Sequence, residues 1–268
     1  MNFWRWKTDK KQLFPEEKNI PWKILLINQN LTNLPLTNFM IKNIKVSVLM
    51  SVYNTDFQLV KRALDSVLNQ DFQDFEIIII DDGSNNNSTQ NHILKFAIEH
   101  ETKITYLRHS NRSQAESINR GVKLSSGEYI TIIDADDEYK PNHLRLCLEE
   151  VKDVDLISTK TETIVDKYED YFVTDKNDPR NVIHVDECVL FATLFGKKEV
   201  FSDNAFEGDY AADSNFFEIV SKKYSVKKAD LRTYIYYRNI PNSVTYLMKK
   251  KHGKKSNETS LYAQSNNW

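Results

Sequence analysis

The feature that most constrains the fold is an almost unbroken apolar run, FEIIII, at residues 75–80. A strand with one face in water alternates apolar and polar side chains, but this run places isoleucine at four consecutive positions. Such strands are typical of parallel sheets that are covered on both faces. The run therefore predicts a buried parallel strand, and parallel strands need crossover connections, which are usually helices.

Strand-like and helix-like segments alternate on both sides of this run. The strand patterns lie at 45–54, 75–80, 103–109 and 128–134, and the helical patterns between them lie at 56–70, 88–98 and 113–124. We expect Ser88 to cap the second of these helices. This order predicts stacked β–α–β units with right-handed crossovers. The expected fold class is α/β, with a doubly wound, mostly parallel sheet flanked by helices.

Composition argues against several functional classes. The chain has 268 residues and a formal net charge of −2, so it can bury a sizeable core and has no basic field for nucleic acid. Its two cysteines, Cys147 and Cys188, lie far apart, which indicates neither a disulfide framework nor a metal knuckle and fits a reducing compartment. No apolar run approaches the roughly 20 residues that span a bilayer. We expect a cytoplasmic protein that does not bind nucleic acid.

Polar side chains follow three of the predicted strands, at the point where each strand ends. Asn54 follows the first, Asp81 and Asp82 follow the second, and three carboxylates within 134–137 follow the fourth. Ligands of doubly wound sheets bind beyond the carboxyl ends of the strands. An isolated acidic pair after a strand is more often a helix cap or a turn. Three such loops at one edge favour a ligand site.

A carboxylate cluster on a loop attracts a hard divalent cation, Mg²⁺ or Mn²⁺. Such an ion keeps one or two protein carboxylates and completes its shell with water and substrate phosphate. The six glycines of the chain are scattered and form no phosphate-binding loop. The pattern therefore predicts a nucleotide-diphosphate substrate whose charge the metal neutralises.

Three segments, taken together, resemble a known family. They are VSVLMSVYN at 46–54, FEIIIIDDGSNNNS at 75–88 and GEYITIIDADDEYKP at 127–141. In this order and spacing they resemble family 2 glycosyltransferases with the GT-A fold and its DXD motif. The resemblance implies inverting transfer of a sugar from a nucleotide-sugar, with a UDP-sugar as the expected donor. It also implies a role in the synthesis of surface glycan or polysaccharide.

The resemblance also implies site residues in the first half of the chain. Ser51 and Tyr53 would flank the base beside Asn54, and Asp82 would bond the base edge. Asp134 or Asp136 would meet the ribose, and Asp136 or Asp137 would bind Mn²⁺ or Mg²⁺. Residues expected to reach the nucleotide from the segment before and within the next helix are Arg112 and Asn119. This segment departs from the family pattern, because Ser113, Ser117 and Ile118 stand where Gly, Ala and Arg are common.

The second half is expected to hold the acceptor and the general base. Asp213 precedes the helical pattern of Phe216 and Phe217 and aligns with the aspartate of the family's Glu-Asp pair, with Ala212 in the position of the glutamate. Asp209 is a competing candidate, and the alternative role for Asp213 is a helix cap. Near the end of this half, Ile240 replaces a common histidine. Arg238 either supplies charge to the phosphates or is a rim residue.

These assignments divide the chain into four parts. They are an N-terminal extension at 1–44, a nucleotide-sugar-binding half at 45–160, an acceptor-binding half with the catalytic base at 161–248, and a basic, polar tail at 249–268. The extension mixes aromatic residues with lysines, so it either lies on a membrane surface or packs on the domain as an added strand and arm. A basic run within the tail leaves open a peripheral contact with the inner face of a membrane.

The sequence predicts a glycosyltransferase that uses a divalent cation and an acceptor hydroxyl on a glycan, a lipid-linked molecule or another compound. Two alternatives stay open. One is a catalytically degenerate module that binds a nucleotide-sugar but lacks the base. The other is a nucleotidyltransferase, although the loop VYNTDF at 52–57 lacks the glycine and lysine that such an enzyme would want.

Overall fold

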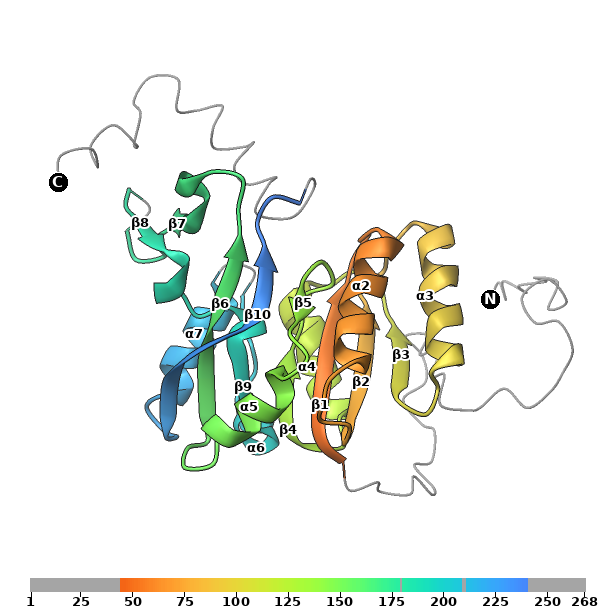
Figure 1. Cartoon of the computed structure of the whole chain (residues 1–268), viewed down its shortest axis with the longest axis horizontal. Helices are drawn as coiled ribbons and strands as arrows, with labels where there is room; N and C mark the ends of the chain where they lie inside the picture. The colour runs from red at the N-terminus through yellow and green to blue at the C-terminus, as the bar shows by residue number, and fades with distance from the viewer. Residues whose placement is uncertain (1–43, 179, 209–210, 241–268) are drawn as a thin grey trace, which may run out of the picture.

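A computed structural model describes residues 44–240 except 179, 209 and 210. In this part of the chain, a mixed eight-stranded sheet carries helices on both faces (Figure 1). The N-terminal extension predicted at 1–44, apart from Ile44, and the tail predicted at 249–268 lie outside the described residues. Among the described residues, no helix combines the length and the apolar character that crossing a membrane requires.

The elements follow one another in the predicted alternation through the first half. The strands are β1 (Ile44–Val52), β2 (Phe75–Asp81), β3 (Ile104–Arg108), β4 (Gly127–Ile132), β5 (Glu138–Tyr139), β6 (Leu156–Ile164), β7 (Phe172–Thr174), β8 (Val182–His184), β9 (Leu194–Lys197) and β10 (Val226–Tyr237). The helices are α2 (Phe57–Leu68), α3 (Asn87–Glu99), α4 (Gln114–Leu124), α5 (His143–Glu150), α6 (Lys198–Asp203) and α7 (Ala212–Val220), with short 3₁₀ turns η1 (Tyr168–Tyr171), η2 (Val185–Glu187) and η3 (Phe191–Thr193).

The strand order is β3-β2-β1-β4-β9-β6-β10-β5. Strands β1 to β4 are mutually parallel, and so are β6 and β10. Strand β9 is antiparallel to both β4 and β6, so these two point the same way. The carboxyl ends of β1, β2, β3, β4, β6 and β10 therefore lie at one edge of the sheet. The expected doubly wound, mostly parallel α/β fold is confirmed, and a small two-stranded sheet of β7 and β8 follows β6 at that edge.

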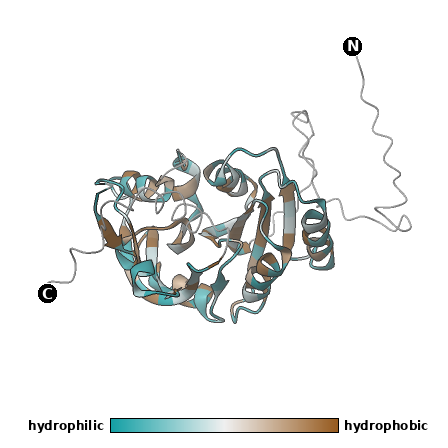
Figure 2. Cartoon of the chain, turned by 90° about the horizontal axis from the view of Figure 1, so that it is seen from above, coloured by the Kyte–Doolittle hydropathy of each residue, from teal (hydrophilic) through white to brown (hydrophobic). Residues whose placement is uncertain are grey.

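The sheet is continuous across the boundary predicted at residue 160, because this residue lies inside β6. Two cores form on its two faces. Helices α2, α3 and α5 cover one face, and α4, α6 and α7 cover the other. Figure 2 shows apolar residues along the strands in the interior and largely hydrophilic outer surfaces on the helices. The division into two functional halves is therefore a division within one sheet.

The isoleucine run of β2 explains why both faces are covered. Ile77 and Ile79 enter the core beneath α2 and α3, whereas Ile78 and Ile80 enter the core beneath α4. All four side chains are at most 1% exposed. Burial of each contributes about 1.5–3 kcal/mol of hydrophobic free energy, so neither face of β2 tolerates exposure to water.

Helix α3 begins slightly earlier than predicted. Asn86, and not Ser88, is the capping residue, and its side chain accepts hydrogen bonds from the amides of Ser88 and Thr89. The expectation for Ser88 is therefore wrong. Its physical basis was sound, since asparagine and serine cap helices about equally well, and three successive asparagines precede the serine.

Gly127 should be essential to the pairing of β1 with β4. A Cβ at this position would lie 2.5 Å from the Ser47 nitrogen and 2.8 Å from the carbonyl carbon of Val46, both backbone atoms. We expect Gly127→Ala to lower the free energy of unfolding by about 1–3 kcal/mol, as overpacking does elsewhere. Urea unfolding tests this, with Ser126→Ala at the neighbouring exposed position as the control. Equal stability of the two variants would contradict the close approach.

Candidate active site

The loops after β1 and β2 are joined by hydrogen bonds between backbone amides and side chains at the carboxyl edge of the sheet. Asn54 adopts a left-handed conformation with φ of 52°. Its backbone amide donates to the Ser84 hydroxyl at 3.0 Å, and its side-chain oxygen accepts from the Asn85 amide at 2.8 Å. Tyr53 beside it is 49% exposed, so its ring is accessible for stacking, and Ser51 is partly buried at the end of β1. The roles of Ser51, Tyr53 and Asn54 toward a nucleotide stay predictions.

The two aspartates that follow β2 have separate structural tasks. Asp81 is fully buried and accepts hydrogen bonds from the Tyr106 hydroxyl at 2.6 Å and the Ser84 amide at 2.8 Å. Asp82 is 3% exposed and accepts from the backbone amides of Arg112 at 2.7 Å and Ser113 at 3.1 Å. Asp82 therefore holds the loop that begins α4. A contact with the base edge was its predicted role, and that role stays a prediction beside this structural one.

Behind Asp82 lies a buried arrangement of serine, histidine and aspartate that the sequence analysis missed. His109 Nδ1 is 3.4 Å from Asp82 Oδ1, and its Nε2 is 3.2 Å from the Ser117 hydroxyl. The order resembles a nucleophilic triad, but Ser117 is 0% exposed and cannot meet a substrate. The group instead ties Asp82 to the first turn of α4. No spacing motif marks it, because the three residues come from different elements.

Ser113 carries backbone strain at the entrance to α4. Its φ of 122° and ψ of 161° belong to a region that is essentially restricted to glycine. It is also the position at which the family resemblance suggested a glycine. Strain of this kind costs about 1–3 kcal/mol and persists only where the surroundings impose it. Here the bond from its amide to Asp82 contributes to that constraint.

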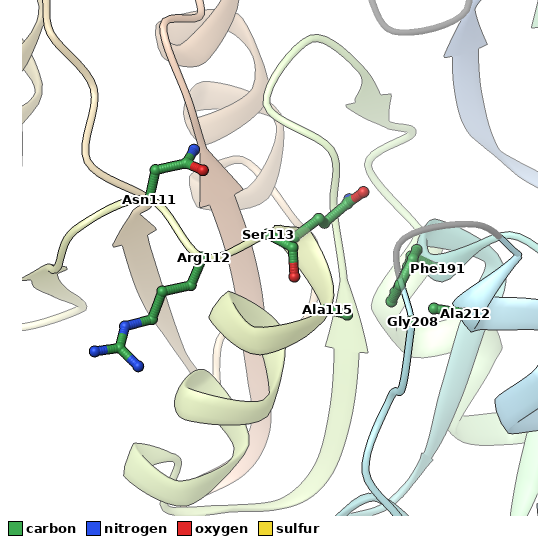
Figure 3. Close-up of a pocket in the computed structure, with 8 residues that line it drawn as sticks. Asn111, Arg112, Ser113, Ala115, Phe191, Gly208 and Ala212 are labelled. Atoms are coloured by element: carbon green, nitrogen blue, oxygen red, sulfur yellow. The ribbon is translucent and has the colours of Figure 1, made fainter.

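A cavity of about 330 Å³ opens between the start of α4 and the start of α7. In Figure 3, Ser113 and Ala115 lie on one side, while Phe191, Gly208 and Ala212 lie on the other. The Arg112 side chain extends away from Phe191 and Ala212, and Arg112 is exposed. Asn119 does not line this cavity. Its side-chain amide donates to the Phe206 carbonyl and accepts from the Phe206 amide, both at 2.9 Å, so the structure gives it a structural task and its nucleotide contact stays a prediction.

The acidic turn after β4 presents its three carboxylates in different settings. Asp134 accepts a hydrogen bond from the Gln114 side chain at 2.8 Å. Burial, with Asp136 and Asp213 nearby, raises the pKa of Asp134 to about 7. Asp137 is 1% exposed and accepts from the Tyr234 hydroxyl at 2.7 Å and the Tyr237 amide at 2.8 Å. Burial, together with Asp134 and Asp136, raises the pKa of Asp137 well above its ordinary value.

The two candidate metal ligands differ in this geometry. Asp137 is 1% exposed and both of its oxygens accept hydrogen bonds that support the turn, and its role as a metal ligand stays a prediction. Asp136 is the better candidate, because no other side chain among the described residues binds its partly buried carboxylate. Within the described residues, no three His, Cys, Asp or Glu side chains converge as a metal site. The donor set therefore fits an ion held by Asp136, with Asp134 nearby, that takes its other ligands from water and phosphate.

The predicted base lies close to this turn. Asp213, in the first turn of α7, accepts hydrogen bonds from the amides of Ser214 at 2.8 Å and Phe191 at 3.2 Å. Burial raises the pKa of Asp213, and its charge acts on Asp134 in turn. The residue that precedes α7 is Ala211, which has a left-handed conformation and no side-chain cap. The fold thus brings Asp213 and the acidic turn together from distant parts of the chain, while Asp209 lies outside the described residues.

Arg238 does not lie at the rim. It is 3% exposed, and its guanidinium donates to the Phe172 carbonyl at 3.4 Å. The Nε atom has no hydrogen-bond partner among the described residues. The rim interpretation is therefore wrong, whereas a role toward phosphate stays a prediction. Ile240, which replaces a common histidine of the family, is partly buried at the end of the described chain.

Comparisons with known proteins match this chain to one group. The family model "Glycosyl transferase family 2" matches residues 47–198. Glycosyltransferase GlyG of Streptococcus pneumoniae serotype 4 is 28% identical over 195 residues, which are 72% of this chain and 60% of GlyG. The putative colanic acid biosynthesis glycosyl transferase WcaA of Escherichia coli K12 is 38% identical over 105 residues, 38% of this chain and 36% of WcaA. The match thus spans less than two thirds of either relative.

Two solved structures share the fold. S. aureus TarS 1–349 in complex with UDP-GlcNAc superposes with a TM-score of 0.59 at 18% identity, over 74% of this chain and 60% of that one. The mannosyltransferase PcManGT from Pyrobaculum calidifontis, in complex with GDP-Man and Mn²⁺, superposes with a TM-score of 0.59 at 18% identity. The superposition covers 80% of this chain and 62% of PcManGT. At this identity the likeness concerns the architecture of the sheet and its helices.

The settings of Asp136 and Asp137 predict losses of stability of different size. Asp137→Ala would leave the Tyr234 hydroxyl and the Tyr237 amide without their acceptor. We expect it to lower the free energy of unfolding by about 1–3 kcal/mol for each group left unpaired. Asp136→Ala should change stability by no more than about 0.5 kcal/mol, as is usual for a side chain without such partners. Urea unfolding without metal or nucleotide compares them, and equal losses would contradict the assignment.

Proposed function

Because the chain belongs to glycosyl transferase family 2, we propose that it transfers a sugar from a nucleotide-sugar to an acceptor hydroxyl with inversion. The observation that carries this proposal is that Gln114, which bonds Asp134, and Phe191, whose amide bonds Asp213, line the same cavity. A donor held by the turn and an acceptor activated by Asp213 would then meet in one site. The cavity of about 330 Å³ beside Gln114 and Phe191 offers space for the transferred sugar.

We propose a UDP-sugar as the donor. Tyr53 would stack on the base, since its ring is half exposed at the end of β1. Asp82 would fix the loop at 111–113 and accept a bond from the imide of uracil with a remaining lone pair. Arg112, which is exposed on that loop, would approach the phosphates. UDP-GlcNAc in TarS and GDP-Man in PcManGT show that proteins of this architecture accept different nucleotides.

We propose that Asp136 holds Mn²⁺ or Mg²⁺ and that Asp134 meets the ribose or shares the ion. When bound, the cation neutralises the charge that develops on the departing diphosphate. Asp134 is oriented for this by the bond from Gln114, and Asp137 keeps the turn in place from beneath. In this proposal Asp134 and Asp136 bind the ligand, whereas Asp137 supports the turn.

Asp213 is proposed as the general base. Each of its oxygens accepts one backbone amide, which fixes the carboxylate and leaves further lone pairs for the acceptor hydroxyl. Its burial raises its pKa, which makes it a stronger proton acceptor than an exposed aspartate. The acceptor oxygen would lose its proton to Asp213 and attack the anomeric carbon from the face opposite the diphosphate.

The wider role is proposed from the resemblance and the relatives. We propose an acceptor on a glycan or a lipid-linked molecule, and a role in the synthesis of surface glycan or polysaccharide. WcaA carries a name from colanic acid biosynthesis, which supports such an acceptor class. A peripheral contact with the inner face of a membrane would rest on the basic run at 249–255, which lies outside the described residues.

The base assignment predicts a selective loss of transfer. Asp213→Asn keeps the size of the side chain but cannot take a proton, and its NH₂ group replaces one of the two oxygens that accept backbone amides. We expect transfer to fall by about 10²–10⁴-fold with little change in UDP affinity, while the one unpaired amide lowers the free energy of unfolding by about 1–3 kcal/mol. Turnover of a panel of UDP-sugars with and without added acceptors measures this, with Asp230→Asn, whose side chain is 72% exposed, as the control. Full activity of Asp213→Asn would leave only a structural role, and an inactive wild type would favour the degenerate binding module.

The metal assignment predicts that nucleotide binding depends on a divalent cation through Asp136. UDP should stabilise the wild-type protein more in Mn²⁺ than in EDTA, and Asp136→Asn should weaken UDP binding in Mn²⁺ by roughly tenfold or more, about 1.4 kcal/mol or above. Thermal unfolding at a series of UDP concentrations gives both affinities. If EDTA leaves the wild-type affinity unchanged, the metal has no part in the site.

A further inference from the structure

One arginine of α2 reaches the acidic turn from behind. Arg62 donates from its terminal nitrogen to the backbone carbonyl of Asp136. Its Nε lies 3.1 Å from Glu138 Oε1, and its guanidinium carbon lies 4.0 Å above the centre of the Tyr237 ring. These three contacts hold the Arg62 side chain across the outer side of the turn. The side chain is 31% exposed there.

The contacts of Arg62 continue through Glu138 and Tyr237 to Asp137. Glu138 Oε1, which faces Arg62, also accepts the Tyr237 hydroxyl at 2.8 Å. The backbone amide of Tyr237 donates to Asp137 Oδ1 at 2.8 Å. The turn is therefore held by Arg62 from α2 on one side and by β10 on the other. Glu138 balances the charge of Arg62, so the guanidinium can lie near the turn without adding an unpaired positive charge.

The orientation of Asp136 depends on its backbone. Among the described residues, no other side chain hydrogen-bonds its carboxylate, which bonds the residue's own backbone amide and lies close enough to Arg62 to interact with its charge. Its carbonyl, however, is held by Arg62. A fixed carbonyl restricts the backbone dihedral angles of Asp136 and hence the direction of its carboxylate. We propose that Arg62 is a positioning residue that presents Asp136 to the divalent cation. This inference rests on the proposed function.

A lysine could not make the same contacts. The guanidinium is planar, so its terminal N–H group can donate to the Asp136 carbonyl while Nε lies beside Glu138 and its face lies on Tyr237. An ammonium group is a compact charge with no flat face. Arg62→Lys therefore keeps the positive charge but cannot bond the Asp136 carbonyl and stack on Tyr237 at the same time. A groove of about 580 Å³ between α2 and β5 is lined by Arg62, so guanidinium from solution could enter the space left by Arg62→Ala.

The experiment measures Mn²⁺ affinity through binding of UDP. Mn²⁺ is titrated into protein with fixed UDP, and thermal stabilisation is recorded for wild type, Arg62→Lys and Arg62→Ala. The matched control is Arg145→Lys, since Arg145 on α5 pairs with Asp71 and Glu149 away from the turn. We expect the apparent Mn²⁺ affinity to fall by about 10–100-fold in both Arg62 variants, the usual effect of removing a residue that orients a metal ligand. The control should match wild type.

Chemical rescue separates positioning from general stability. Millimolar guanidinium chloride should restore part of the Mn²⁺ affinity of Arg62→Ala, whereas sodium chloride at the same ionic strength should not. Asp136→Asn should not respond to guanidinium at all. If Arg62→Lys folds and binds Mn²⁺ as tightly as wild type while Asp136→Asn does not, the positioning role is overturned and the proposed function stands. If wild-type UDP binding is independent of Mn²⁺, the metal part of the proposed function fails and takes the role of Arg62 with it.

Discussion

The site depends on one buried carboxylate. Asp137 accepts the Tyr234 hydroxyl and the Tyr237 amide and thereby joins the turn after β4 to β10, nearly a hundred residues later in the chain. The same tyrosine hydroxyl accepts the backbone amide of Asp134. Removing a carboxylate from water is costly unless its oxygens are bonded, so these contacts must be kept for the fold to keep the turn. The other acids of the turn are presented from this anchor.

Buried carboxylates support loops twice at this edge. After β2, Asp81 is fully buried against Tyr106, while Asp82 holds the amides that lead into α4. After β4, Asp137 is the anchor, whereas Asp136 is the acid proposed to hold the ligand. In each of these loops at least one acid carries the loop, and the strain at Ser113 shows how tightly the loop after β3 is held.

Much of the fold could be predicted because it is encoded locally. The isoleucines of β2 alternate between two cores, and this requires cover on both faces, hence crossover helices. The gathering of the polar residues that follow the strands could be predicted from the same topology, because the carboxyl ends of parallel strands lie at one edge of the sheet. Asp213 could be placed near the acidic turn only through the resemblance, because no local pattern relates residue 134 to residue 213.

By itself, the sequence determined the alternation of strands and helices, the edge that the parallel strands share and the group of acids that gathers there. These follow from hydrophobic periodicity and from strand direction, which are properties of short segments. Only the tertiary structure decided which acid faces outward and which is buried, that Asn119 binds Phe206, and that Arg62 lies behind Asp136. The reason is that a carboxylate's role depends on the donors around it, and those donors come from α2, α4 and β10, whose approach no single segment specifies.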